Sequence, residues 1–309
     1  MKGIELSRLF SSEWLLPFID REFPDLRSHI AIGRFMGSDA LGADDHLSQD
    51  HNWGPTVEIY VDDEYAISDD ELAARINSAA PSEFLGTRRR GGHDTAVTLK
   101  RTHAYIKQVF GRIPKEPREW LCCAAQFEDI ESMLYFLRHG SLFHDGSGQL
   151  TALRARYHAY PDDIHRLRLA TCFYDIAHYG EYNFVWRLVE RNDVIAMQIA
   201  LGHFSKAVMR LHFYLDRDFA PYWKWLPHEF RRQGYSQQIN EQLLALPGLS
   251  PLEQSSAIQW ICGQLSARLL SDGVVPSKME NPQGVPWFFR FREEILRTIT
   301  DPEIRSLTW

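Results

Sequence analysis

The chain has 309 residues, of which 44% are hydrophobic and 13% are aromatic, and this composition excludes a largely disordered protein. Its formal net charge is −7, so we expect no binding to nucleic acid through bulk electrostatics. The sequence lacks an apolar stretch near the ~20 residues of a membrane-spanning helix, and the N-terminal residues lack the apolar core of a signal peptide. These features predict a cytoplasmic protein with no membrane partner.

The first hundred residues carry the mixed signals of a small α+β domain. Apolar residues with helical spacing occupy residues 3–23, and this helix is expected to end near Pro24. A second helix should begin at Ser68, because a serine followed by acidic residues suits a helix N-terminus. Three strands are predicted from apolar runs, near residues 28–36, 55–61 and 94–100.

Helical periodicity dominates the rest of the chain. A helix is predicted from Thr102 to Phe110, and the proline- and glycine-containing segment that follows it indicates a domain boundary. We therefore predict an α+β domain at residues 1–113 and a helical domain at residues 114–309. The helices expected in the second domain lie near residues 120–137, 162–178, 184–191, 193–215, 236–246, 251–271 and 288–299.

A glycine-serine turn follows the first predicted strand. Gly37 permits the backbone to turn where a side chain would obstruct an approaching phosphate, and Ser38 adds a hydroxyl. Asp50 and Asn52 lie two positions apart, so on a neighbouring strand both would point to the same side. Two oxygen ligands there suit Mg²⁺, which needs one or two carboxylates in addition to the phosphates of a substrate.

These residues carry a family resemblance. Gly37-Ser38, eleven intervening residues and Asp50-His51-Asn52 resemble the Gly-Ser, spacer, Asp-x-Asp signature of the nucleotidyltransferase superfamily, which includes DNA polymerase beta and the kanamycin nucleotidyltransferases. The longer pattern Gly-Ser-x-x-x-Gly-x-Asp-Asp-x-x-Ser-x-Asp-His looks like an uncharacterised bacterial branch, a domain-of-unknown-function family. The segment Phe219-Ala220-Pro221-Tyr222-Trp223-Lys224-Trp225 is similar to a second motif of that branch.

The resemblance implies a nucleotidyltransferase-like mixed sheet followed by a helical domain. It further implies transfer of a nucleoside monophosphate from a nucleoside triphosphate, such as ATP, to a hydroxyl acceptor with Mg²⁺. Gly37 and Ser38 would then hold the triphosphate, and Asp50 with Asn52 would bind the metal and act in catalysis. The acceptor could be a small molecule, a protein or RNA, and no residue pattern selects among them.

Four further residues are candidates for the same site. Lys224 and Tyr222 could bind the nucleotide, because an ammonium held among aromatic rings can reach a triphosphate. The alternative is a helix whose rings pack inward while Lys224 extends to water. In the spacer, Asp45 is a candidate metal ligand together with its neighbour Asp44, although consecutive acids in a loop are equally typical of a solvated surface.

Asn52 keeps a second hypothesis open. It stands where the signature has its second aspartate, and its amide oxygen brings no negative charge to a metal. The third carboxylate of the superfamily comes from a later strand, where this chain offers Thr98 and, at the strand edge, Asp94. The protein is therefore either an enzyme or a catalytically degenerate nucleotide-binding or regulatory protein on the same fold, with a toxin-antitoxin component as a further alternative.

Overall fold

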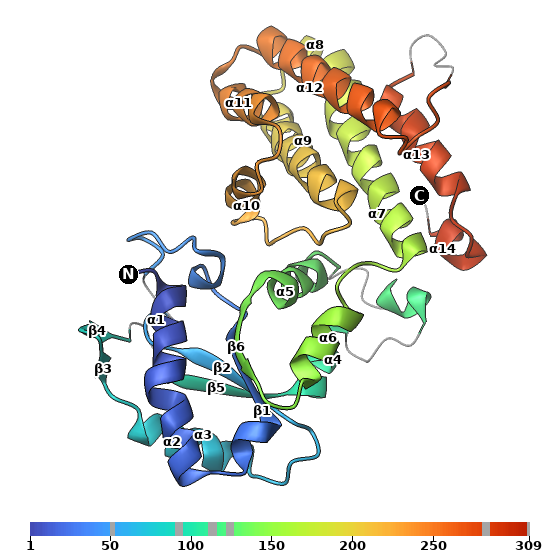
Figure 1. The fold of residues 1–309 in the computed structure, drawn as a ribbon. Coiled ribbons are helices and arrows are strands. Elements are labelled where there is room, and N and C mark those ends of the chain that lie inside the picture. The colour runs from blue at the N-terminus through green and yellow to red at the C-terminus, as the bar shows by residue number, and fades with distance from the viewer. Residues whose placement is uncertain (50–52, 90–94, 111–115, 122–126, 280–284, 308–309) are drawn as a thin grey trace. The chain divides into compact units, whose positions relative to one another are not determined.

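The structure is a computed structural model that describes residues 1–49, 53–89, 95–110, 116–121, 127–279 and 285–307 (Figure 1). The chain forms two compact units. Unit 1 consists of Met1–Lys115 and Cys122–Ala159, and unit 2 consists of Glu116–Leu121 and Tyr160–Trp309. This division differs from the predicted boundary between residues 113 and 114, because a strand and two helices beyond that boundary belong to unit 1.

Unit 1 is built on a four-stranded mixed sheet with the strand order β5-β2-β1-β6. The strands are β1 (Ile30–Arg34), β2 (Val57–Val61), β5 (Val97–Arg101) and β6 (Ser141–Asp145). β1 runs antiparallel to β2 and to β6, whereas β2 and β5 are parallel. A separate two-stranded pair is formed by β3 (Glu83–Phe84) and β4 (Thr87–Arg88). The mixed sheet and its helices confirm the predicted α+β fold class.

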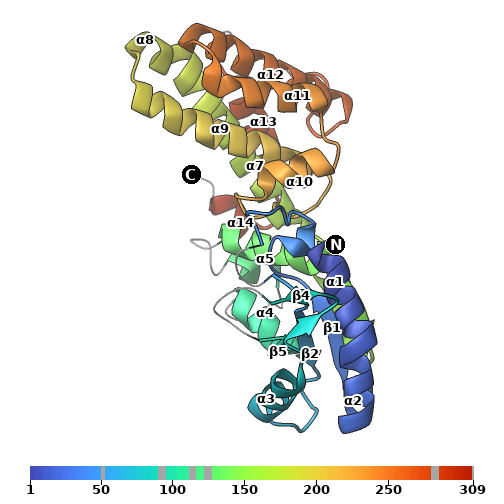
Figure 2. The ribbon, with the colours of Figure 1, turned by 90° about the vertical axis from the view of Figure 1, so that its left-hand side faces the viewer.

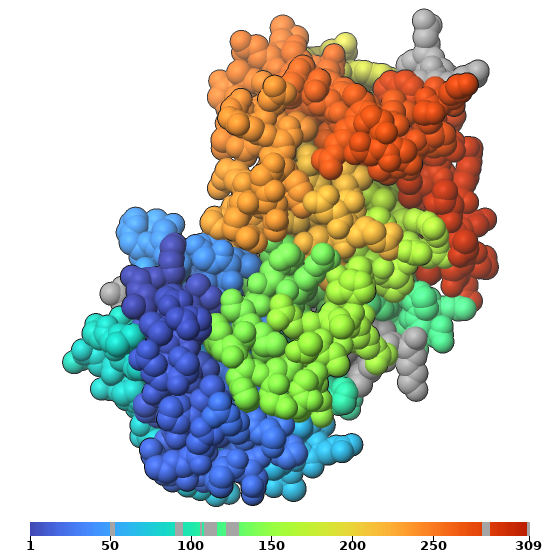
Figure 3. All heavy atoms as spheres, viewed as in Figure 1, coloured from blue at the N-terminus to red at the C-terminus, as the bar shows by residue number. Residues whose placement is uncertain are grey.

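The N-terminal helix lies on the surface of unit 1, where Figure 3 shows it in dark blue. It consists of α1 (Gly3–Leu9), a π-helical turn (Phe10–Leu15) and α2 (Leu16–Glu22), as the helical spacing predicts. α3 (Asp69–Ala79) begins directly after Ser68, whose hydroxyl accepts the N–H of Glu71 at 3.3 Å. Ser68 is therefore the helix cap that the sequence predicts.

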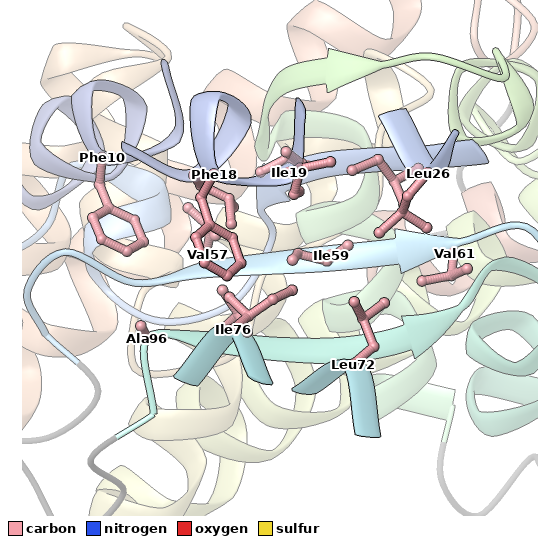
Figure 4. Close-up of a cluster of buried hydrophobic side chains, with 14 residues drawn as sticks. Phe10, Phe18, Ile19, Leu26, Val57, Ile59, Val61, Leu72, Ile76 and Ala96 are labelled. Carbon is pink, nitrogen blue, oxygen red and sulfur yellow. The ribbon is translucent and has the colours of Figure 1, made fainter. Parts of the chain in front are cut away.

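The main core of unit 1 lies on one face of the sheet. Val57, Ile59 and Val61 alternate along β2 and point to the same face, as the period of a strand requires. Figure 4 shows these three residues between side chains of the N-terminal helix and side chains of α3. The core also contains Phe10, Phe18, Ile19, Leu26, Leu72, Ile76 and Ala96.

The other face of the sheet carries the remaining side chains of β2, namely Glu58 and Tyr60. Tyr60 packs edge-on against Tyr105 of α4 (Thr102–Phe110), with ring centroids 5.9 Å apart. The Tyr105 hydroxyl donates to the carbonyl of Met133 in α5 (Phe127–His139) at 3.2 Å. Helices α4 and α5 therefore lie over part of this second face, where Glu58 and Tyr60 are buried.

β6 is the one strand of the sheet that the sequence does not predict. It follows α5, pairs with β1 and is succeeded by α6 (Gln149–Arg156). The sequence predicts a mostly helical chain from residue 114 onwards, and Ser141–Asp145 is a strand within that range. Its partner lies far upstream in the sequence, so no local pattern reveals the pairing.

The secondary structure of unit 2, within its described residues, consists of helices joined by turns and loops. Its longer helices are α7 (Asp162–Asp175), α9 (Val194–Leu215), α11 (Gln237–Ala245), α12 (Pro251–Ser271) and α13 (Trp287–Arg297). The shorter ones are α8 (Val189–Arg191), α10 (Leu226–Arg232) and α14 (Pro302–Ser306). α7 packs against both α9 and α13, and the helices gather into a bundle (Figure 2). Among the described residues, no helix combines the length and apolar character needed to cross a membrane.

Candidate functional site

The predicted glycine-serine turn lies directly after β1. Gly37 has a φ of +91°, and a Cβ atom added there would lie 2.7 Å from Oδ1 of Asp39. Ser38 precedes a short 3₁₀ turn (Asp39–Leu41), and its hydroxyl donates to the carbonyl of Ser48 at 3.3 Å. Only glycine fits this backbone conformation without strain or a close contact. The structure therefore places a tight turn where the sequence predicts a phosphate-binding one.

A buried charge cluster holds this turn against the sheet. The Arg34 guanidinium donates from Nε to Oδ2 of Asp39 at 2.9 Å and from Nη2 to Oδ1 at 3.0 Å. Its Nη1 donates to Oε1 of Glu58 at 3.2 Å, and the Phe35 N–H donates to Oε2 of Glu58 at 2.6 Å. All three charged side chains are buried. We call Arg34, Asp39 and Glu58 the Arg34 cluster.

The Arg34 cluster ties three elements together. Arg34 ends β1, Asp39 follows the turn, and Glu58 lies on β2 opposite Gly33. Burial raises the pKa of Glu58, and the nearby Arg34 guanidinium offsets part of that rise. Because its oxygens accept bonds from Arg34 and Phe35, Glu58 is committed to fixing the turn.

Lys100 places a cation beside the turn. Its Nζ lies 3.5 Å from Sδ of Met36, the residue before Gly37. The ammonium also lies over the rings of Tyr60 and Tyr105, 5.7 and 5.4 Å from their centroids. Burial lowers the pKa of Lys100, and the charge of Glu58 opposes that effect. Within the described part of the chain no carboxylate lies within ion-pair distance of Lys100, so this charge is not cancelled by a bonded partner.

Asp44 has a structural role. It is buried and accepts the Gly3 N–H at 2.7 Å and the Trp53 indole N–H at 3.2 Å through Oδ2. Lys2 lies 3.1 Å from its other oxygen. Burial alone would raise the pKa of Asp44, but the hydrogen bonds from these groups lower it. Asp44 therefore fastens the N-terminus of α1 to the loop after the turn.

Asp45, the candidate metal ligand, is exposed at the surface of the same loop. Its Oδ1 accepts the N–H groups of Leu47 and Ser48 at 3.1 and 2.9 Å, which is a local turn stabilised by a side chain. The bond from Ser48 lowers the pKa of this carboxyl. Asp45 is thus ionised and anchored, and its part in metal binding stays a prediction.

The central predicted metal ligands, Asp50 and Asn52, lie outside the described residues, as does Asp94. Thr98 is exposed on β5 and pairs in register with Glu58. Within the described ranges, no three His, Cys, Asp or Glu side chains gather as a metal site would require. The predicted Mg²⁺ site therefore depends on Asp50 and Asn52, whose oxygen donors suit that ion.

The predicted nucleotide-binding residues Tyr222 and Lys224 belong to unit 2, in the segment before α10. This segment is not helical at Tyr222, and its rings do not all pack inward: Tyr222 is 40% and Trp223 is 62% exposed. The Lys224 ammonium lies over the Trp225 ring, 4.9 Å from its centroid. The segment thus presents a cation and two aromatic rings to solvent, and its contact with a nucleotide stays a prediction.

Sequence reasoning missed the Arg34 cluster and Lys100. A signal was present, because Glu58 interrupts the apolar run Val57 to Val61 and must point away from the core that its neighbours fill. Lys100 likewise follows Leu99 in a strand. What the sequence lacks is the strand register that brings these charges beside the Gly37 turn.

Two comparisons with known proteins find similarities. Residues 128–226, less than half of the chain, match the model of a family described as Domain of unknown function (DUF4037). The matched segment includes Phe219–Trp225, one of the motifs on which the resemblance rests. A crystal structure of a nucleotidyltransferase-like protein from Exiguobacterium sibiricum 255-15 is similar with 12% identity and a TM-score of 0.37, covering 98% of this chain and 91% of that chain. No curated protein matches the chain.

Replacing Gly37 with alanine tests whether the turn is packed as described. We expect a loss of stability larger than the roughly 1 to 2 kcal/mol that a left-handed conformation costs an alanine, because the new Cβ also displaces Asp39 from Arg34. Gly86→Ala is the matched control, since Gly86 has a φ of +74° but no atom within 4 Å of an added Cβ. Urea unfolding measures both variants, and equal losses would contradict the packed turn.

Proposed function

We propose that this protein is a Mg²⁺-dependent nucleotidyltransferase, which transfers a nucleoside monophosphate from a nucleoside triphosphate to a hydroxyl acceptor and releases pyrophosphate. The observation that carries the proposal is the Gly37–Ser38 turn after β1, which the Arg34 cluster bonds to the sheet. In the sequence, eleven residues separate Ser38 from Asp50. This spacing resembles that of the Gly-Ser, spacer, Asp-x-Asp signature of the superfamily. A rigid turn suits a reaction in which catalysis consists mainly of positioning and electrostatics.

The charges beside the turn support binding of a triphosphate. The Lys100 ammonium has no bonded carboxylate within the described residues, so it can act as a point charge toward phosphate oxygens. Its partial burial strengthens any such interaction, because the local dielectric is lower than that of water. Tyr222 and Lys224 stay proposed nucleotide-binding residues, with the Lys224 ammonium over the Trp225 ring.

The metal would be held by Asp50 and Asn52, with Asp45 in a supporting role. Asp39, Asp44 and Glu58 already accept hydrogen bonds from protein donors. The proposed metal ligands are therefore Asp50, Asn52 and Asp45. Mg²⁺ bound there supplies neutralisation of the charge that develops on the transferred phosphate. This chain's own part is to hold the triphosphate at the turn and to direct its reacting phosphate toward the acceptor.

Calorimetric titration tests the proposal. We expect one of ATP, GTP, CTP and UTP to bind the wild-type protein with Mg²⁺ and to bind much more weakly without it. The Asp50→Ala variant should lose this metal dependence, because it lacks the carboxylate ligand. Asp25→Ala removes an exposed carboxylate from the same unit and should behave as the wild type. Absence of binding for all four nucleotides would contradict the proposal.

The second candidate function is a nucleotide-binding or regulatory protein without turnover, and Asn52 is the observation that favours it. An Asn52→Asp variant separates the two. In an enzyme, this change alters the metal preference and retains pyrophosphate release. In a degenerate protein, it strengthens Mg²⁺ binding and yields no product. A partner that co-purifies with the protein would instead favour a toxin-antitoxin component.

A further inference from the structure

Unit 2 contains a hollow of about 550 Å³ that neither the sequence motifs nor the proposed function use. It is bounded by two consecutive π-helical segments, η6 (Ile176–Tyr182) and η7 (Phe184–Leu188), by α12 and by the start of α13. Its volume falls within the range of roughly 300 to 1,000 Å³ that is typical of small-molecule sites. The residues that give it its chemistry are Glu181, Trp186, Cys262, Ser266, Leu270 and Trp287.

The π-helical segments set the position of Glu181. π-Helices are rare, and where they occur they frequently mark functional sites. A Cβ atom at Gly180 would lie 2.5 Å from the ring of Phe204 on α9, so the glycine allows η6 to approach α9 closely. The next residue, Glu181, lines the hollow.

Glu181 is a carboxyl group with no cationic partner in the part of the chain that the structure describes. Its Oε2 accepts the Phe288 N–H in the first turn of α13 at 2.9 Å. Burial raises its pKa to about 7, and the N–H groups of Phe288 and Trp287 offset only part of that rise. Within the described residues no Lys, Arg or His lies within ion-pair distance of it. An amide at this position would cap α13 equally well, so the helix cap alone does not account for a half-buried carboxyl.

Two indole rings line the same hollow as this carboxyl. Trp186 follows on η7 and is 42% exposed, and Trp287 begins α13. The faces of indole rings attract cations, and this attraction strengthens where water is excluded. Cys262 on α12 is 3% exposed, and burial raises the pKa of its thiol, so this wall of the hollow is uncharged.

We propose that this hollow binds a small organic ammonium ion, with the cationic head against Glu181 and the apolar body between Trp186 and Trp287. A carboxylate beside aromatic rings attracts a cation and repels an anion, so the site discriminates against phosphates and nucleotides. The hollow lies wholly within unit 2. The proposal is independent of nucleotidyl transfer, and failure of one leaves the other standing.

The probe for this site is phenethylammonium, and its matched neutral control is 2-phenylethanol. Calorimetric titration at pH 8, where Glu181 is ionised, should show saturable binding of phenethylammonium by the wild-type protein. We expect about tenfold weaker binding of 2-phenylethanol, because it cannot form the charge-assisted hydrogen bond. Equal affinities for the two compounds, or no saturable binding of the ammonium up to about 10 mM, would overturn the proposal.

Two variants assign the binding to the hollow. Glu181→Gln keeps an acceptor for the Phe288 N–H but removes the charge, and it should weaken phenethylammonium binding about tenfold. Trp186→Leu removes a partly exposed ring, leaves Glu181 unchanged and should weaken binding about threefold. Glu190→Gln removes an equal charge from the surface of α8 and should have no effect. Wild-type affinity in Trp186→Leu, or in folded Glu181→Gln, would place the ligand elsewhere.

Discussion

Replacing Arg34 with methionine is expected to lower the free energy of unfolding by about 3 to 5 kcal/mol, the usual cost of removing one partner from a buried ion pair. Asp39 and Glu58 would each remain buried without the guanidinium that bonds them. Methionine has nearly the volume of arginine, so it leaves no large cavity. The expected loss of stability therefore comes from removal of the charge and its hydrogen bonds. The turn at Gly37 should loosen as well, because Arg34 bonds Asp39 after the turn to Glu58 on β2.

Urea unfolding of the wild type and of Arg34→Met measures this loss. Arg88→Met is the matched control, because the Arg88–Glu83 pair is exposed and should contribute no more than about 1 kcal/mol. Adding Glu58→Gln to Arg34→Met should recover part of the loss, since one of the unpaired charges is then gone. A loss below about 1 kcal/mol in Arg34→Met would show that the cluster does not hold the turn.

Asp163→Asn is expected to cost about 2 to 3 kcal/mol near neutral pH, a value typical of a carboxylate with a strongly lowered pKa. Asp163 lies in the first turn of α7, and it accepts bonds from the Thr300 hydroxyl at 2.7 Å, the Asp301 N–H at 2.8 Å and Arg166 Nη1 at 2.7 Å. Burial alone would raise the pKa of Asp163, but these donors hold it well below its usual value. The amide N–H₂ group of an asparagine would face some of these donors, and a donor cannot accept their hydrogen bonds.

The pH dependence of this loss has a definite sign. The unfolded carboxyl titrates near its ordinary value of 3.8, whereas the folded one stays ionised at lower pH. Below that value the unfolded state binds more protons, so the contribution of Asp163 is complete above about pH 5 and declines as the pH falls. The difference between the wild type and Asp163→Asn, measured by urea unfolding, should therefore be constant from about pH 5 to pH 8 and shrink toward pH 3.

A neighbouring residue provides the control for Asp163. Asp162 is 67% exposed and pairs with Arg217 at the surface. Asp162→Asn should therefore cost about 1 kcal/mol or less at every pH. If the two variants behaved alike, the tie between α7 and the segment before α14 would not have the strength proposed for it.

Much of the fold could be predicted from local sequence patterns. The alternation in β1 and β2, the helical spacing of α9 and α12, and the serine cap of α3 each depend on residues close together in the chain. β6 could not be predicted, because Ser141–Asp145 is short and pairs only with a strand far upstream. β6 and its pairing with β1 both lie within unit 1.

The candidate site was predictable in part for a similar reason. The need for glycine at position 37 follows from the motif, and the structure shows a positive φ there. The contributions of Glu58 and Lys100 depend on strand register, which sequence periodicity does not supply. Asp50 and Asn52 lie outside the described residues, so their role as metal ligands stays a prediction, as does that of Tyr222 and Lys224 at the nucleotide.

The position of β6 in the sheet sets an order of events during synthesis on the ribosome. β1 emerges early, but its outer neighbour is not made until residue 145 has been added. Until then, one edge of β1 exposes unpaired backbone groups, which is the kind of surface that recruits other nascent chains. A fragment cut at residue 113 would keep that edge permanently, whereas a fragment that extends to Ala159 contains the strand that covers it.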